Sequence, residues 1–313
     1  MVLGTIRAST AARALASCKK RLDTETCSAP TDAWPAHVGR SLAVLPAMKL
    51  PGSRRPESSV VVYEDAGSLN LLSLLMMHRL TWFTRREEYA PHAKRAARQV
   101  LQALETLAAL DIVHNDIWMG QVLVDGAPRE LSTVSYTLID FSGSFLFEHD
   151  PEKRAGEPCW GSQSHRAPEM LACSERRWAQ RRPRTASAGR SEPYSEPVHA
   201  VDMFAFGSAI FPALFAGIPL MYGSPAMYDL DSPPSSLDSP YGPELMRLLS
   251  GSFPHFAAHV RAKAEATHGG APPMLRELEA DGGSGLRLLW RMVQYEPKNR
   301  ISPTEALRHP FLQ

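Results

Sequence analysis

The spacing of hydrophobic positions predicts two strands and two helices in the first part of the chain. Residues 60–63 form a β-branched run that predicts a strand. Residues 42–48 predict a second, shorter strand that Pro46 interrupts, and residues 69–80 predict a helix. Between 89 and 111, apolar residues recur at steps of four and three, as on one face of an amphipathic helix.

The second half of the chain is predicted to be mainly helical. Residues 121–124 and 135–139 predict two short strands joined by a turn. Residues 203–215 are apolar on all sides, which is typical of a helix buried in the centre of a domain. Residues 286–293 are also helical in pattern. Residues 302–305 form a capping box with proline at the first helical position, so a last helix should begin there.

Composition supports a folded domain. Of the 313 residues, 44% are hydrophobic and 21% charged, which is ordinary for globular proteins and excludes extensive disorder. The formal net charge of +1 gives no overall attraction to nucleic acid or acidic lipid. No apolar run is long enough for a membrane span. The four cysteines lack disulfide or zinc spacing, so we expect a reducing compartment and a cytoplasmic protein.

The first 22 residues allow a second interpretation of location. They contain five arginines and lysines, and no acidic residue comes before Asp23. Basic, acid-poor, helix-compatible segments of this kind resemble organelle transit peptides. The alternative is a basic helix over 6–22 that belongs to the fold.

Two short motifs place a carboxylate directly after an apolar run. Asp116 follows Ile-Val-His-Asn, and Asp140 follows Leu-Ile and precedes Phe141. If both lie at one cleft, one carboxylate can orient a nucleophile while the other, with an amide, holds a divalent ion. The alternative for either residue alone is a carboxylate that caps a turn.

The landmarks that follow make the pattern specific. They are Gly161-Ser162, Ala167-Pro168-Glu169, the run from Asp202 to Gly207, Pro297 with Arg300, and the final His309-Pro310-Phe311-Leu312. In this order they resemble the eukaryotic protein kinase family, from about residue 60 to residue 313. The resemblance implies an α+β, kinase-like fold. We expect a reduced N-terminal lobe with the hinge over 1–66 and a helical C-terminal lobe over 67–313.

The resemblance also implies roles for individual residues. Asp116 would accept the proton of the substrate hydroxyl, Asp140 would bridge metal and nucleotide phosphates, and Gln121 stands where the family has a magnesium-binding Asn. The backbone of a hinge that includes Val62, Glu64 and Ala66 would meet adenine. Four further residues would be structural. His114 matches the structural His of the family, Glu169 and Arg300 would form a buried ion pair, and Asp202 would hold the backbone of the catalytic loop.

Several family features are absent or altered. Before residue 60 we find no Gly-rich loop and no strand that carries the phosphate-binding Lys, so the first three strands are expected to be missing. In the catalytic loop, Asn115 replaces Arg and Trp118 replaces Lys. An indole carries no charge and cannot substitute for the ammonium group. Ser142 replaces the Gly that follows Asp140-Phe141, which is the mildest change.

Two further segments stand apart from these motifs. The Arg-rich insertion 174–198 is interpreted as a solvated loop, with a docking site for an acidic partner or a phosphorylation site as the alternative. The run Met76-Met77-His78 is interpreted as packing on a helix beside the hinge.

These departures lead us to expect a degenerate kinase (pseudokinase) that serves as a binding, scaffold or regulatory module with weak or no phosphoryl transfer. The alternative is a divergent or N-terminally truncated serine/threonine kinase that transfers the ATP γ-phosphate to protein hydroxyls. A small-molecule kinase is disfavoured by the Ala-Pro-Glu motif and the 297–312 segment. ATP and Mg²⁺ are the expected cofactors if nucleotide binding is retained, and the expected partner is a protein rather than nucleic acid or membrane.

Overall fold

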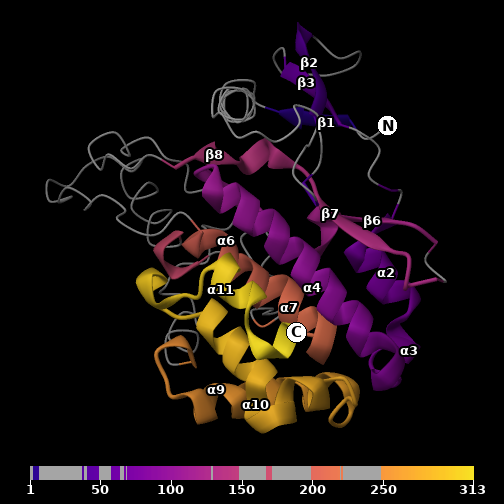
Figure 1. Ribbon diagram of the computed structural model, residues 1–313, viewed down its shortest axis with the longest axis vertical. Coiled ribbons are helices and arrows are strands. Elements are labelled where there is room, and N and C mark those ends of the chain that lie inside the picture. Colours follow the sequence, from indigo (N-terminus) through magenta and orange to yellow (C-terminus); the bar gives the residue numbers. More distant parts are fainter. Residues whose placement is uncertain are drawn as a thin grey trace, which may run out of the picture.

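The fold combines a small sheet with a larger helical body (Figure 1). The computed structural model describes residues 3–6, 37–38, 41–48, 58–63, 67, 69–127, 130–147, 167–170, 199–218, 220 and 248–313. Within these residues, no helix is both long enough and apolar enough to span a membrane. The predicted α+β class, with a reduced N-terminal lobe and a helical C-terminal lobe, is confirmed.

The N-terminal sheet has three antiparallel strands in the order β1-β3-β2. β3 (Ser58–Tyr63) is central, as its β-branched run predicts, and pairs with β1 (Leu3–Ile6) on one side and β2 (Ser41–Met48) on the other. β2 is an edge strand, and its register shifts where Pro46 lies, which is where proline is tolerated in a sheet.

β1 is a strand that the sequence did not predict, since only a helix over 6–22 was expected in the first part of the chain and the first three strands of the family were expected to be missing. Its four residues, Leu-Gly-Thr-Ile, are too few to give a periodic signal, and Gly4 weakens any strand propensity. The strand forms because β3 offers a free edge with which it can pair. The remainder of the helix predicted over 6–22 lies outside the described residues.

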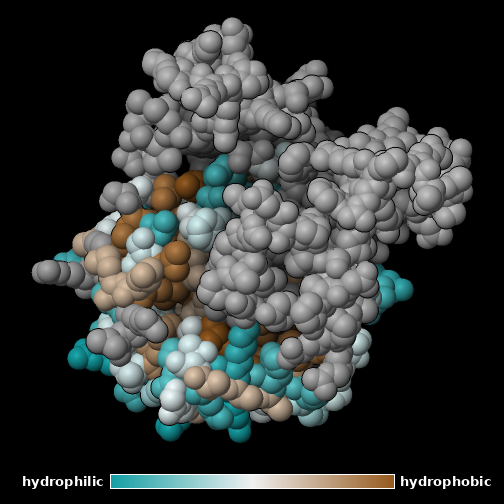
Figure 2. All heavy atoms as spheres, turned by 180° about the vertical axis from the view of Figure 1, so that it is seen from behind, coloured by the Kyte–Doolittle hydropathy of each residue, from teal (hydrophilic) through white to brown (hydrophobic). Residues whose placement is uncertain are grey.

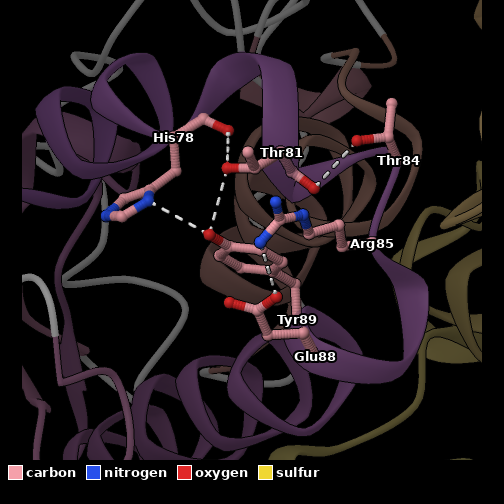
Figure 3. A network of polar contacts seen from close by, with 6 residues as sticks. All are labelled: His78, Thr81, Thr84, Arg85, Glu88 and Tyr89. Carbon is pink, nitrogen blue, oxygen red and sulfur yellow. Dashed lines mark hydrogen bonds and ion pairs between the residues drawn. The ribbon is translucent and has the colours of Figure 1, made fainter.

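The helix predicted over 69–80 is divided into α2 (Leu71–Met77) and α3 (Arg79–Trp82). Figure 3 shows the polar contacts that join α3 to the first turn of α4 (Arg86–Ala109). The Tyr89 hydroxyl lies 3.2 Å from Nδ1 of His78 and 3.0 Å from Oγ1 of Thr81. These contacts fix the turn between the two helices.

The interpretation of Met76 and Met77 as packing residues is wrong. Their side chains are 67% and 63% exposed, the highest values among the large hydrophobic residues that the structure describes. Both lie in the last turn of α2, beyond the buried Leu74 and Leu75.

Seen from behind (Figure 2), hydrophilic residues cover the lowest part of the helical body, and hydrophobic residues gather above them.

The long helix is confirmed as α4 (Arg86–Ala109). Its core-facing side carries small and branched apolar residues, among them Ala93, Ala97, Val100 and Leu104. The short strands β6 (Val122–Asp125) and β7 (Ser135–Leu138) pair with each other, and β4 (Leu69–Asn70) adds to β6. A second ladder joins β5 (Ile112–Val113) to β8 (Phe145–Leu146).

The predicted buried helix is confirmed by a continuous helical segment in which every residue from 200 to 216 is buried. It consists of α6 (Ala200–Ala205), a π-helical turn η5 (Phe206–Ile210) and α7 (Phe211–Ala216). Gly207 is required in this turn because a Cβ there would lie 2.6 Å from Cβ of Met292. The buried helix therefore packs closely against the following helices.

The remaining helices form the base of the body: α9 (Phe253–His268), α10 (Leu275–Met292), η7 (Pro297–Asn299), α11 (Pro303–Leu307) and η8 (Pro310–Leu312). The helix predicted from residue 286 is the second part of α10, which is interrupted by non-helical backbone from Ala280 to Gly283. The capping box is confirmed: Oγ of Ser302 accepts a hydrogen bond from the Glu305 N–H, and the Glu305 carboxylate accepts one from the Ser302 N–H.

Candidate functional site

The loop after β5 is held by a buried carboxylate from α6. Asp202 is 3% exposed, and its two carboxylate oxygens accept the backbone N–H groups of His114 at 2.7 Å and Asn115 at 2.8 Å. Burial raises the pKa of Asp202, while the nearby His114 and the two N–H groups oppose this shift. Asp202 thus fixes the turn that leads into Asp116.

Backbone conformation in this turn is unusual. Asn115 has a φ of +67°, and Asp140, at the end of the next hairpin, has a φ of +65°. Asn and Asp tolerate this left-handed region better than other non-glycine residues, but it remains uncommon. Strained residues of this kind cluster at functional sites.

Side chains join the Asp116 loop to the Asp140 loop. The His114 ring contacts the carbonyl of Ile139 at 3.0 Å through Nε2, and its centroid lies 4.9 Å from that of Phe141. Ser144 Oγ donates to the carbonyl of His114 at 3.1 Å, and the Asn115 amide donates to the carbonyl of Gly143 at 3.3 Å. The two loops therefore hold a fixed spacing.

Gln121 brings the two carboxylates together. It ends the short helix η1 (Met119–Gln121), and its amide nitrogen donates to Oδ2 of Asp116 and to Oδ2 of Asp140, each at 3.1 Å. The Gln121 carbonyl also accepts the N–H of Ile139 at 2.9 Å, which ties its backbone to the Asp140 loop. The structure thus places the three residues predicted for the reaction centre around a single amide group.

This donor set is suited to magnesium. Carboxylate and amide oxygens are the ligands that Mg²⁺ takes from proteins, and Asp140 and Gln121 would hold it here. In the structure Gln121 presents its nitrogen rather than its oxygen to the carboxylates, so its amide would have to turn over to act as a ligand. When bound, the metal would neutralise charge on nucleotide phosphates.

The segment between Asp116 and Gln121 supplies no positive charge. Its four residues are Ile117, Trp118, Met119 and Gly120, and Ile117 and Met119 are buried in the core. The indole of Trp118 lies directly over Gly120, where an added Cβ would be 2.2 Å from the ring. Trp118 also packs against the core, so its ring is folded onto its own loop.

Glu169 and Arg300 form a bidentate ion pair. Nη1 and Nη2 of Arg300 lie 2.6 and 2.7 Å from the two carboxylate oxygens of Glu169. The Arg300 side chain is fully buried and Glu169 is 13% exposed. Arg300 also donates to the backbone carbonyls of Ala200, Gln294 and Tyr295. The pair joins the short segment 167–170 to α6 and η7.

The predicted nucleotide hinge is described only in part. Val62 lies in β3, paired with Leu3 and Ala43, whereas Glu64 and Ala66 lie outside the described residues. The Arg-rich segment 174–198 also lies outside them.

Sequence reasoning missed several contacts. It did not predict that Gln121 contacts Asp116 as well as Asp140, that Asn115 reaches Gly143, or that Ser144 supports His114. It also missed the bridge by which His37 and Val38 join Leu138 in β7. The short spacing from Asp116 to Gln121 was the one signal available, because it allows both side chains to meet across a single turn.

Comparison with known proteins agrees with this geometry. The protein kinase domain family matches residues 56–312. Mitogen-activated protein kinase spm1 of Cytospora mali is 26% identical over 217 residues, which cover 69% of this chain and 44% of that protein. Two rice (Oryza sativa subsp. japonica) relatives are similar: mitogen-activated protein kinase 12 (24% identical, 68% of this chain, 31% of the relative) and mitogen-activated protein kinase 16 (28%, 68% and 36%).

The chain spans less than half the length of these three relatives. The family match nevertheless covers most of the chain, and it includes the Asp116 and Asp140 loops, the buried helix and the Glu169–Arg300 pair. This chain belongs to the protein kinase family.

Proposed function

We propose that the chain is a degenerate protein kinase that acts as a binding or regulatory module and has weak or no phosphoryl transfer. The observation that carries this proposal is the composition of the site around Gln121. Two carboxylates share one uncharged amide, and the loop between Asp116 and Gln121 contributes an indole where the family has an ammonium group.

The loss of one cation from the loop between Asp116 and Gln121 is large enough to matter for catalysis. Phosphoryl transfer depends on positioning and on cations that stabilise the negative charge of the transferred group. A unit charge at 4 Å contributes about 4 kcal/mol at an effective dielectric constant of about 20. Loss of one such cation from the transition state would slow transfer by about a thousandfold.

The competing function is a divergent serine/threonine protein kinase that uses ATP and Mg²⁺. One observation favours it: a pure scaffold has no chemical need for both Asp116 and Asp140. The chain nevertheless holds Asp140 in left-handed backbone and fixes both loops with side-chain hydrogen bonds. Protein substrates would be the acceptors for this second candidate.

A thermal-shift titration of the chain with ATP, with and without Mg²⁺, distinguishes the two functions. A ligand that binds only the folded state adds about 2.7 kcal/mol of stability at a hundredfold excess over Kd. The proposal predicts no magnesium-dependent shift with millimolar ATP. A clear magnesium-dependent shift that the Asp140→Asn variant abolishes would instead support the divergent active kinase.

A further inference from the structure

A cationic groove runs along α4, and its lining contains no residue of the loop that carries Asp116. It has a volume of about 870 Å³ and is bounded by α4 and by the C-terminal residues Leu312 and Gln313. Figure 1 shows the C-terminus beside α4, and a hydrogen bond of 2.7 Å from Nη1 of Arg98 to the carbonyl of Leu312 joins them. With Glu277 of α10, which also lines it, the groove is built from three separate parts of the chain.

The floor of the groove is a row of hydrogen-bond donors. Arg95, Arg98, Gln99 and Gln102 all line it, at the spacing that puts residues in one stripe on a helix. Gln99 uses its amide oxygen to accept the N–H of Tyr136 at 2.8 Å, which leaves its NH₂ group as a donor. A ligand in this groove would be held by accepting hydrogen bonds.

The two arginines are oriented by the fold, and half of each guanidinium remains available. Nη1 of Arg95 donates to the carbonyls of Leu131 and Ser132, and Nη1 of Arg98 donates to Leu312. Among the residues that the structure describes, Nε and Nη2 of both side chains contact no acceptor. This Nε–Nη2 edge is the fork that binds a carboxylate in bidentate fashion.

Positive charge predominates in the groove. Arg86 and Lys94 both pair with Glu277, at 2.8 and 2.7 Å, so one carboxylate is shared by two cations. Glu87 is the other acidic residue of the lining. With Arg95 and Arg98 included, four basic side chains face two acidic side chains, although the whole chain has a net charge of only +1.

We propose that this groove binds an acidic segment of a partner protein, with two of its carboxylates held by the Nε–Nη2 edges of Arg95 and Arg98. The proposal rests on the proposed function, because it supplies the surface through which a binding module would act. The separate carboxylates of such a segment can each meet one arginine edge. A nucleic acid is the alternative occupant, and the test below distinguishes it from the peptide.

The spacing of the two arginines suggests the form of the segment. Residues three apart on a helix have Cβ atoms about 5–6 Å apart. In an extended peptide, every second side chain lies on the same face, at intervals of about 7 Å. Two long arginine side chains can meet carboxylates at this interval, so glutamate at every second position should fit.

The test measures fluorescence anisotropy of a labelled peptide with glutamate at alternate positions, added to the full chain. We expect binding that weakens by about tenfold or more in Arg95→Gln and again in Arg98→Gln, the loss of about one charge-assisted interaction each. Arg95→Lys and Arg98→Lys keep the charge but lose the fork, and should also weaken binding. Arg85→Gln is the matched control, because Arg85 is 63% exposed and pairs with Glu88 outside the groove.

Three outcomes would overturn the proposal: no binding of the acidic peptide, equal binding by the Arg95 and Arg98 variants, or equal binding of a peptide with lysine in place of glutamate. Tighter binding of a single-stranded oligonucleotide that the same variants abolish would overturn it in favour of a nucleic-acid site. Melting curves of each variant show whether it is folded. Phosphoryl transfer is measured separately, so a finding that the chain is active would contradict the proposed function without deciding whether the groove binds.

Discussion

The amide nitrogen of Gln121 lies 3.1 Å from a carboxylate oxygen of Asp140 and donates a hydrogen bond to it. The same nitrogen makes an equal contact with Asp116. This arrangement keeps two like charges in place with a neutral group. It follows that Gln121 stabilises the structure of the site, in addition to any part it takes in metal binding.

Replacement of Gln121 should therefore destabilise the fold. Gln121→Leu removes both hydrogen bonds and leaves two carboxylates without this donor, so we expect a loss of about 1–3 kcal/mol in the free energy of unfolding. Urea denaturation at neutral pH measures it. Gln102→Leu on the surface of α4 is the control and should change stability by less than about 0.5 kcal/mol. Equal effects of the two variants would contradict the supporting role.

Trp118 and Gly120 should be energetically coupled. A Cβ at residue 120 would lie 2.2 Å from the indole, so Gly120→Ala must displace the ring, at a cost of about 1–3 kcal/mol. In the Trp118→Leu background the same change should cost much less, because a smaller side chain leaves room for the Cβ. A double-mutant cycle by chemical denaturation measures the coupling, and additive effects would contradict it.

Breaking the Glu169–Arg300 pair should be costly because both groups are largely buried. Arg300→Met removes both hydrogen bonds to the Glu169 carboxylate and those to three backbone carbonyls, and we expect a loss of about 3–5 kcal/mol. Glu169→Leu combined with Arg300→Met should recover part of this loss. Arg85→Met at the exposed Arg85–Glu88 pair should have almost no effect. A small effect of Arg300→Met alone would refute the prediction.

Tyr136 should make stability depend on pH in the alkaline range. Its hydroxyl is buried and has no hydrogen-bond partner among the residues that the structure describes. Burial raises its pKa from 10.0 to about 12, with Arg95 opposing the shift. The unfolded chain loses this proton near pH 10 while the folded chain keeps it. The contribution of Tyr136 to the free energy of unfolding is therefore fully present below pH 10. It falls by about 3 kcal/mol as the pH rises towards 12.

The Tyr136→Phe variant provides the check. Relative to the wild-type chain, it should lose less stability between pH 10 and pH 12, and it should be equally or more stable at pH 7, because it no longer buries an unpaired hydroxyl. Urea denaturation of both proteins across this range measures the difference. Parallel pH profiles would show that the hydroxyl is not buried in solution.

Elements with a long or chemically distinct pattern could be predicted from the sequence. The four-three spacing of apolar residues located α4, and the all-round apolar run over 203–215 located the buried helix, which begins at Ala200. Ser302 with Glu305 located the start of α11. These signals are local, so no knowledge of the tertiary structure is needed. β1 could not be predicted because its stability comes from pairing with β3, which lies more than 50 residues away in sequence.

In the candidate site, too, the residues could be predicted from the sequence, whereas their contacts depend on the tertiary structure. Motif order selected Asp116, Gln121 and Asp140 as one group, but it could not show which atom of Gln121 faces the carboxylates. The exposure of Met76 and Met77 depends on which side of α2 packs against the body, and an apolar pair gives no indication of this. Likewise, no sequence pattern places Arg98 beside Leu312.

The most direct test of the central claim is phosphoryl transfer from γ-labelled ATP, with Mg²⁺, to a general protein substrate. The wild-type chain is compared with Asp116→Asn, prepared and purified in the same way. A site with two carboxylates on one neutral amide and no cation in the adjoining loop predicts the same background rate for both proteins. Transfer by the wild-type chain that clearly exceeds that of Asp116→Asn would contradict the account and establish an active kinase.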